Sequence, residues 1–498
     1  LGYNAGPVDG AYGGKTKRAL EAFYAKSGGS YDGKLDANEV ADLTSAMSTA
    51  GIDITIQSGA EIESNGSLIY IPKQPSIIES RYWWTHASTV ADFNGDGIMD
   101  VWITGTQTPP EEFRNYQSVN TGDKCGKTKL GCDSPLTKPS LFIGTKDGKY
   151  LLRDDLVIDN RAKPGQSLAR QNLVADFNGD GKLDIFVADT GLGSHGGFKD
   201  SYFLSQPNGK LLESSETHLS HPKLEVFNHG AATGDIDGDG DMDIVMVHGD
   251  HLGTLHCYYN NGTGNMKLRK CASIMAFAIE LADMDGDGDL DALVGAIENE
   301  YSSNPTAITG IVWNNGKGFF PSYDVTRLQQ YKKRWGGIPE VSASDLDNDG
   351  DLDIVYSRVG DLYVGTAIQI IENLGNKKFK DHGIFPLVEA PDDFIAVSVG
   401  NEWNDFIDSI KFRDVDGDGD LDVYLAGDHL KTNGTVLLNN GNFNFDIIRP
   451  AEAVALFTDG SNKKIIIGHK KHILTDEEQS VEDELAAFEA ELAAELGE

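Results

Sequence analysis

The sequence predicts an all-β protein assembled from a repeated unit, and two repeated features lead to this expectation. The first is a short Asp- and Gly-rich pattern that occurs six times between residues 92 and 422, each time followed by an apolar segment with the composition of a strand. The second is a strand, an Asn/Asp/Gly turn and a return strand, which recur between copies of the first pattern. Together they predict a series of strand-built repeats.

The Asp-rich pattern places oxygen-bearing side chains at positions 1, 3, 5 and 9 of a nine-residue loop, with Gly at position 6. Its copies are DFNGDGIMD at 92–100, DFNGDGKLD at 176–184, DIDGDGDMD at 235–243, DMDGDGDLD at 283–291, DLDNDGDLD at 345–353 and DVDGDGDLD at 414–422. Ca²⁺ takes six to eight hard oxygen ligands, which these side chains and a backbone carbonyl at position 7 can supply. Without a cation, the carboxylates of one loop would repel each other.

The sequence therefore predicts about six Ca²⁺ ions, one in each loop. The predicted ligands at positions 1, 3, 5, 7 and 9 are Asp92, Asn94, Asp96, Ile98 and Asp100; Asp176, Asn178, Asp180, Lys182 and Asp184; Asp235, Asp237, Asp239, Asp241 and Asp243; Asp283, Asp285, Asp287, Asp289 and Asp291; Asp345, Asp347, Asp349, Asp351 and Asp353; and Asp414, Asp416, Asp418, Asp420 and Asp422. An EF-hand needs Glu at position 12 and a following helix, whereas apolar or aromatic residues and strands follow here.

The spacing of the loops fits one blade of a β-propeller per repeat. Successive first Asp residues are 84, 59, 48, 62 and 69 residues apart, which leaves room for about four short strands and their turns. With its loops and hairpins, the chain resembles the FG-GAP/VCBS-repeat β-propellers, including the integrin α-subunit head, over residues 50–472. The resemblance implies seven four-stranded blades. A degenerate seventh blade without an ion would come from residues 454–468, with its missing strand from 66–75.

Two short segments flank the predicted propeller. Residues 1–49 resemble the second half of a peptidoglycan-binding type 1 domain, through the Gly-Pro-Val-Asp-Gly segment at 6–10 and a helix through Leu20 and Phe23. The family's first helix would precede Leu1, so peptidoglycan binding and a spacer role both stay open. Residues 473–498 predict an acidic amphipathic helix, which would either dock on a partner chain or form a frayed tail.

Charge and cysteine content narrow the class of protein. The net charge of −36 argues against nucleic-acid and anionic-membrane partners, and no apolar run is long enough for membrane insertion. The four cysteines form two local pairs, Cys125 with Cys132 and Cys257 with Cys271, which favours two disulfides over four free thiols. Disulfides predict an extracytoplasmic location: secreted, periplasmic or at the cell surface.

The sequence contains no GxSxG, HExxH or P-loop motif, and no other catalytic constellation is recognisable. We therefore expect a non-enzymatic, calcium-dependent binding or adhesion protein of the bacterial cell envelope or surface. A polysaccharide lyase or hydrolase on the same scaffold and a structural subunit of a surface assembly are the alternatives.

By analogy with integrin-type blades, the segments that enter each first strand lie on the face opposite the calcium loops. Aromatic, Arg and His side chains in these segments predict a site there for a glycan or a protein ligand. Those residues are Trp83, Trp84, His86, Arg170, His229, Arg334, Trp335 and Trp403. An equally open interpretation is that they only plug the central channel.

Overall fold

The structure is a computed structural model, and it is all-β in the residues that it describes. These are residues 82–107, 136–146, 150–191, 198–225, 227–248, 254–298, 306–328, 334–391, 394–396, 403, 407, 409–426, 432 and 434–449. The predicted N-terminal module at 1–49, the seventh blade, the acidic helix at 473–498 and the pair Cys125 and Cys132 lie outside the described residues.

The described strands form small sheets, numbered here 1 to 6 in chain order. Sheets 1 to 3 contain, in order, β1 (Tyr82–Ala91), β2 (Asp100–Gln107), β3 (Ser140–Gly144) and β4 (Tyr150–Leu152); β6 (Ala169–Ala175), β7 (Asp184–Asp189), β8 (Ser201–Ser205) and β9 (Leu211–Glu213); and β10 (Asn228–Gly234), β11 (Asp243–His248), β12 (Leu255–Tyr259) and β13 (Lys267–Ala272).

Sheets 4 to 6 contain β14 (Ala278–Ala282), β15 (Asp291–Gly295), β16 (Gly310–Val312) and β17 (Val325–Arg327); β18 (Val341–Ser344), β19 (Asp353–Arg358), β20 (Thr366–Asn373) and β21 (Phe379–Val388); and β22 (Ser409–Arg413), β23 (Asp422–Ala426), β24 (Val436–Asn439) and β25 (Phe445–Ile448). Each sheet is an antiparallel meander, and sheet 2 gains the short strand β5 (Val157–Ile158), which pairs with β9 in parallel. Helical structure among these residues is limited to α4 (Ser215–His218) and the 3₁₀ turns η2 (Asp154–Leu156) and η3 (Asp361–Tyr363).

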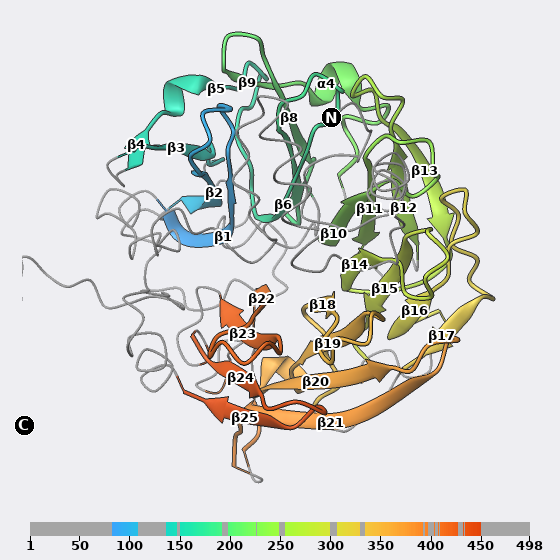
Figure 1. Cartoon of the computed structure of the whole chain (residues 1–498). Coiled ribbons are helices and arrows are strands. Elements are labelled where there is room, and N and C mark those ends of the chain that lie inside the picture. The colour runs from blue at the N-terminus through green and yellow to red at the C-terminus, as the bar shows by residue number, and fades with distance from the viewer. Residues whose placement is uncertain are drawn as a thin grey trace, which may run out of the picture.

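The sheets follow one another around a common centre, with the first strand of each sheet on the inside (Figure 1). The first strands of neighbouring sheets contact each other from β1 through β6, β10, β14 and β18 to β22. The outer strands β13, β17, β21 and β25 lie at the periphery (Figure 1). The described part is therefore a radial series of antiparallel sheets, in agreement with the repeat spacing of the sequence.

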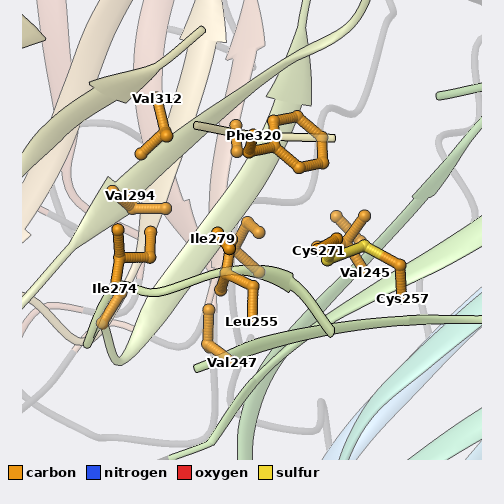
Figure 2. Packing of buried hydrophobic residues seen from close by; sticks show 14 of the residues in the cluster. Val245, Val247, Leu255, Cys257, Cys271, Ile274, Ile279, Val294, Val312 and Phe320 are labelled. Atoms are coloured by element: carbon orange, nitrogen blue, oxygen red, sulfur yellow. A yellow bond between two sulfur atoms is a disulfide. The ribbon is translucent and has the colours of Figure 1, made fainter. Parts of the chain in front are cut away.

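The hydrophobic core lies between neighbouring sheets. The second and third strands of each sheet are largely buried, and β7, β8, β15, β16 and β19 are buried at every residue because neighbouring sheets cover both of their faces. One cluster joins sheets 3 and 4 through Val245, Val247, Ile279, Val294 and Phe320 (Figure 2). Equivalent clusters join sheets 1 and 2, 2 and 3, 4 and 5, and 5 and 6.

The predicted disulfide between Cys257 and Cys271 is confirmed. It connects β12 to β13 across a Cα–Cα distance of 5.8 Å, and both residues are fully buried in the cluster between sheets 3 and 4 (Figure 2). The bridge closes the β12–β13 hairpin, whose turn at Asn260, Asn261 and Gly262 is one of the Asn/Asp/Gly turns that the sequence predicted.

Candidate metal centres and ligand face

Each Asp-rich loop joins the first strand of its sheet to the second, and its own backbone holds it in shape. In all six loops the N–H at position 6 donates to the carboxylate at position 1, over 2.7–3.0 Å. The glycine that supplies this N–H has a positive φ, between 81° and 101°, which L side chains rarely adopt. The turn therefore needs glycine at position 6, as the pattern predicted.

The Asp at position 9 is the most buried acidic residue of each loop, and no position-9 Asp is more than 3% exposed. Its Oδ2 accepts the N–H of position 2, as from Phe93 to Asp100 over 3.0 Å, and its Oδ1 accepts an N–H from the third strand of the same sheet. Burial raises the pKa of Asp100 to about 6 and that of Asp243 to about 8. These carboxylates therefore hold the loop against the sheet through hydrogen bonds.

Four loops bring three carboxylates together. In each, one ligand oxygen from every member lies within 4.8 Å of the others. The groups are Asp235, Asp237 and Asp239; Asp283, Asp285 and Asp291; Asp345, Asp347 and Asp353; and Asp414, Asp416 and Asp422. These residues fit a hard divalent cation such as Ca²⁺, which binds carboxylate oxygens.

An orphaned oxygen supports this fit. Oδ1 of Asp237 is buried and has no hydrogen-bond partner in the part of the chain that the structure describes. Burial raises the pKa of Asp237, and the neighbouring carboxylate of Asp239 raises it further. A cation would satisfy the orphaned oxygen and remove this repulsion.

The loops at 92–100 and 176–184 carry less charge. Position 3 is Asn94 or Asn178, so the three-carboxylate arrangement of the later loops is not formed among these described residues. Their backbone geometry is the same, since the position-3 amide oxygen accepts the N–H of position 5 over 2.8 and 2.9 Å. At position 7, the ammonium group of Lys182 donates to the carbonyl of Gln206 over 3.3 Å.

The predicted ligand residues Arg334 and Trp335 line a cavity of about 410 Å³ at the end of sheet 5 that faces away from its metal loop. Strand β19 starts at Asp353 in the loop and ends at Arg358, about 17 Å further on. There, Nη1 of Arg358 donates to the carbonyl of Trp335 over 2.6 Å. The cavity therefore lies on the face opposite the loops.

Apolar and charged groups share the lining of this cavity. Trp335 is only 7% exposed and forms part of its wall, while Ile395 is 83% exposed. Arg334 lies 3.9 Å from Glu389, in an exposed ion pair of little energetic weight. Trp403 is adjacent, since its carbonyl accepts the N–H of Gly365 over 2.9 Å.

His229 lies in a second, smaller cavity on the same face. Its ring contacts those of Phe227 and Phe277, and Nδ1 lies 3.0 Å from the carbonyl oxygen of Phe277. Burial lowers the pKa of His229 well below its usual value, and the positive charge of Arg170 adds to this effect. The ring is therefore neutral, with Nδ1–H as the donor.

Gly360 and Leu362 line both cavities, so the structure brings Arg334, Trp335 and His229 into one neighbourhood. Trp83, Trp84 and His86 belong to β1, but their side chains are outside the described part of the chain. Binding of a ligand by these residues stays a prediction.

Several residues of this face were not predicted from the sequence. Leu362, Glu389 and Ile395 line the larger cavity. Leu362 and Tyr363 have φ values of 53° and 58°, a strained left-handed conformation that is uncommon without glycine. Gly360-Asp361 is a turn signal in the sequence, but nothing local indicates that this turn lies beside residues 389–391 and 394–396.

The geometry defines an all-β repeat protein with acidic loops between the first and second strands. A family model described as FG-GAP-like repeat matches residues 176–246 and 235–294, so the chain contains FG-GAP-like repeats. The predicted resemblance of residues 1–49 to a peptidoglycan-binding domain finds no support in these matches. No helix among the described residues is long and apolar enough to cross a membrane.

No curated protein matches the chain significantly. Among solved structures, the V. cholerae biofilm matrix protein Bap1 is similar at 17% identity and a TM-score of 0.33, over 57% of this chain and 40% of Bap1. A triple arginine-to-alanine mutant of AofleA from Arthrobotrys oligospora is similar at 11% identity and a TM-score of 0.37, over 74% of this chain and 87% of that one. The chain thus spans less than half of Bap1, and neither likeness enters the functional argument.

Proposed function

We propose that this chain is an extracytoplasmic, calcium-dependent binding or adhesion protein of the bacterial cell envelope or surface, built as a seven-bladed FG-GAP/VCBS propeller. The observation that carries the proposal is the separation of two kinds of site. Carboxylate clusters lie at one end of the sheets, and a mixed apolar and charged cavity lies at the other.

Calcium has a structural role in this proposal. The loops crowd carboxylates that repel each other in the absence of a cation, and the ion joins the first two strands of each sheet. A ligand that binds only the folded state stabilises it, by about 4 kcal/mol at a concentration 1,000 times its Kd. Filled loops would thus give the opposite face a rigid support.

The opposite face has the features of a recognition site. Its larger cavity has about 410 Å³ of space, which falls within the range of small-ligand pockets. The lining of this cavity combines apolar side chains with the charged side chains of Arg334 and Glu389. Such a lining suits glycan or protein ligands, whose surfaces have both apolar and polar groups. The strained residues Leu362 and Tyr363 lie where the two cavities meet, and such strain is often kept at functional sites.

Two lining substitutions test the proposal, Arg334→Ala and Ile395→Asp. Both side chains are exposed enough to be changed without opening the core, unlike Trp335. The variants and the wild type are probed on an array of neutral and acidic oligosaccharides and on a peptide array, with calcium and with EGTA. We expect wild-type binding in calcium, and at least a tenfold loss in either variant.

Tyr323→Ala is the matched control, because Tyr323 is 87% exposed and lies between β16 and β17, outside the cavity lining. It should bind as the wild type does. Equal binding by all variants would place the ligand site elsewhere, and turnover of an arrayed glycan by the wild type would favour the enzymatic alternative.

A further inference from the structure

An asparagine lies at the end of the third strand in each of sheets 3 to 6. These residues are Asn260, Asn314, Asn373 and Asn439. The backbone N–H of each donates to the position-9 Asp of its own sheet's loop, over 2.7–2.9 Å. The same residue therefore touches the deepest carboxylate of its own metal loop.

The side chain of each asparagine reaches two loops at once. Its Nδ2 donates to the position-8 carbonyl of its own loop, over 2.9–3.2 Å. The same nitrogen donates to the position-2 carbonyl of the preceding sheet's loop, over 2.7–2.9 Å. Those preceding-loop acceptors are Phe177, Ile236, Met284 and Leu346. Both amide hydrogens are thus used, one on each side of the boundary between two sheets.

These bonds form one continuous chain. The position-2 residue that accepts from the asparagine also donates its own N–H to the position-9 Asp of its loop. Each loop is therefore bonded to the next, from the loop at 176–184 to the loop at 414–422. The carbonyl held by the asparagine belongs to the peptide unit that leads directly into the position-3 ligand, so the asparagine orients that ligand.

Sheets 1 and 2 have no asparagine at this position. Gly144 and Ser205 occupy the equivalent places, and the backbone N–H of each donates to Asp100 or Asp184. The hydroxyl of Ser205 also donates to Asp180, within its own sheet's loop. Neither side chain has an amide group, so this link between the loops at 92–100 and 176–184 cannot form.

We propose that these four asparagines couple calcium binding between neighbouring sheets, so that the loops from 176–184 to 414–422 fill cooperatively while the loop at 92–100 fills independently. The inference rests on the proposed calcium binding. An ion that orders one loop fixes its position-8 carbonyl and position-9 carboxylate, which anchor the asparagine. The anchored amide then holds the position-2 peptide of the preceding loop in its binding geometry, which lowers the cost of ordering that loop.

A double-mutant cycle on the full chain tests the coupling between the loops at 345–353 and 414–422. Asp416→Ala weakens the second loop, and Asn439→Ser copies the arrangement that sheet 2 already has at Ser205. The readout is hydrogen exchange of the peptide at 345–353 over a calcium titration, together with total calcium by calorimetry. We expect Asp416→Ala to weaken binding at 345–353 by about fivefold or more in the wild-type background, and to add nothing to Asn439→Ser.

Asn440→Ser is the control, because Asn440 is the exposed neighbour of Asn439 and its side chain bonds to residues of its own β24–β25 hairpin. It should leave the effect of Asp416→Ala intact. An unchanged effect in the Asn439→Ser background would overturn the coupling, whereas a wild type that binds no calcium would refute the proposed function instead. If Asn439→Ser does not fold, the same cycle at the partly buried Asn314, with Asp287→Ala and the peptide at 235–243, decides the question.

Discussion

At the scale of single residues, Lys377 changes the charge of one of the proposed metal centres. The ammonium group of Lys377, on the β20–β21 turn, lies 3.0 Å from Oδ2 of Asp285 and 3.8 Å from the ring centroid of Trp313. Asp285 is the predicted position-3 ligand of the neighbouring loop, and the lysine neutralises part of its negative charge. A calcium ion bound by this loop would therefore compete with the lysine for the carboxylate of Asp285.

Lys377→Met should raise the calcium affinity of the loop at 283–291. An exposed ion pair contributes about 0.2–1 kcal/mol, which corresponds to a gain of up to about fivefold. Hydrogen exchange of the loop peptide over a calcium titration measures the change, and Lys378→Met on the same turn is the control. A loss of affinity would mean that Lys377 supports the loop rather than competing with the ion.

The buried carboxylate of Asp200 lies outside the Asp-rich loops, and we expect its titration to make the stability of the protein depend on pH. Its carboxylate accepts from the N–H of Asp189 and from Nδ2 of Asn228, and burial raises its pKa to about 7. An unfolded Asp titrates near pH 4, so the folded state binds more protons between pH ~4 and ~7. The contribution of Asp200 to stability therefore falls as the pH rises through this window.

In saturating calcium, Asp200→Asn should reduce the fall in Tm between pH 5 and pH 8, because the variant has no carboxylate to ionise. The amide oxygen still accepts the N–H of Asp189. Asp324→Asn, at an exposed position, is the control and should follow the wild type. Parallel Tm profiles for the wild type and Asp200→Asn would contradict the prediction.

At the scale of secondary-structure elements, a disulfide bond stabilises the β12–β13 hairpin. Cys257 and Cys271 are 14 residues apart and fully buried between sheets 3 and 4. Closing a loop of about 15 residues stabilises a protein by about 3 kcal/mol. Replacing both cysteines with Ala should lower the free energy of unfolding by this amount in urea melts, and a reductant should then have no further effect. An unchanged midpoint would show that packing alone holds the hairpin.

At the scale of the whole molecule, the large negative net charge opposes folding. The net charge is −36, and six Ca²⁺ ions would reduce it to −24 because each contributes two positive charges. Self-repulsion at this level opposes the compact state, and salt screens it. EGTA should therefore lower the Tm sharply, and added NaCl should recover part of the loss.

Graded chelation should empty the loops at 92–100 and 176–184 first, because an Asn replaces Asp at position 3 and a residue without a carboxylate stands at position 7. The proposed coupling through Asn260 would bring the release of 176–184 closer to that of the later loops without reversing this order. Hydrogen exchange of the loop peptides during a chelator titration gives the order of release. Last release from these two loops would show that charge does not rank the sites. An unchanged Tm in EGTA, with no calcium found by metal analysis, would refute the calcium assignment altogether.

The sequence by itself determined the loops, the strands that flank them, the hairpins and the Cys257–Cys271 pair. Each depends on residues that are close along the chain: Gly at position 6 turns the backbone, and the Asp at position 1 closes the turn on the N–H of that glycine. Backbone conformation and short-range hydrogen bonds set the loop geometry, which is the same in all six loops. The sequence could therefore predict them repeat by repeat.

Only the tertiary structure decided which side chains meet between neighbouring repeats and which side chains are exposed to solvent. Asn439 bonds to a carbonyl 93 residues earlier, and Lys377 reaches a carboxylate 92 residues earlier, in neighbouring sheets. Trp335, predicted as a stacking residue, is almost buried in the wall of a cavity that Leu362 and Ile395 share. Such neighbours depend on how one sheet packs against the next, and no local pattern in the chain encodes which side chains meet there.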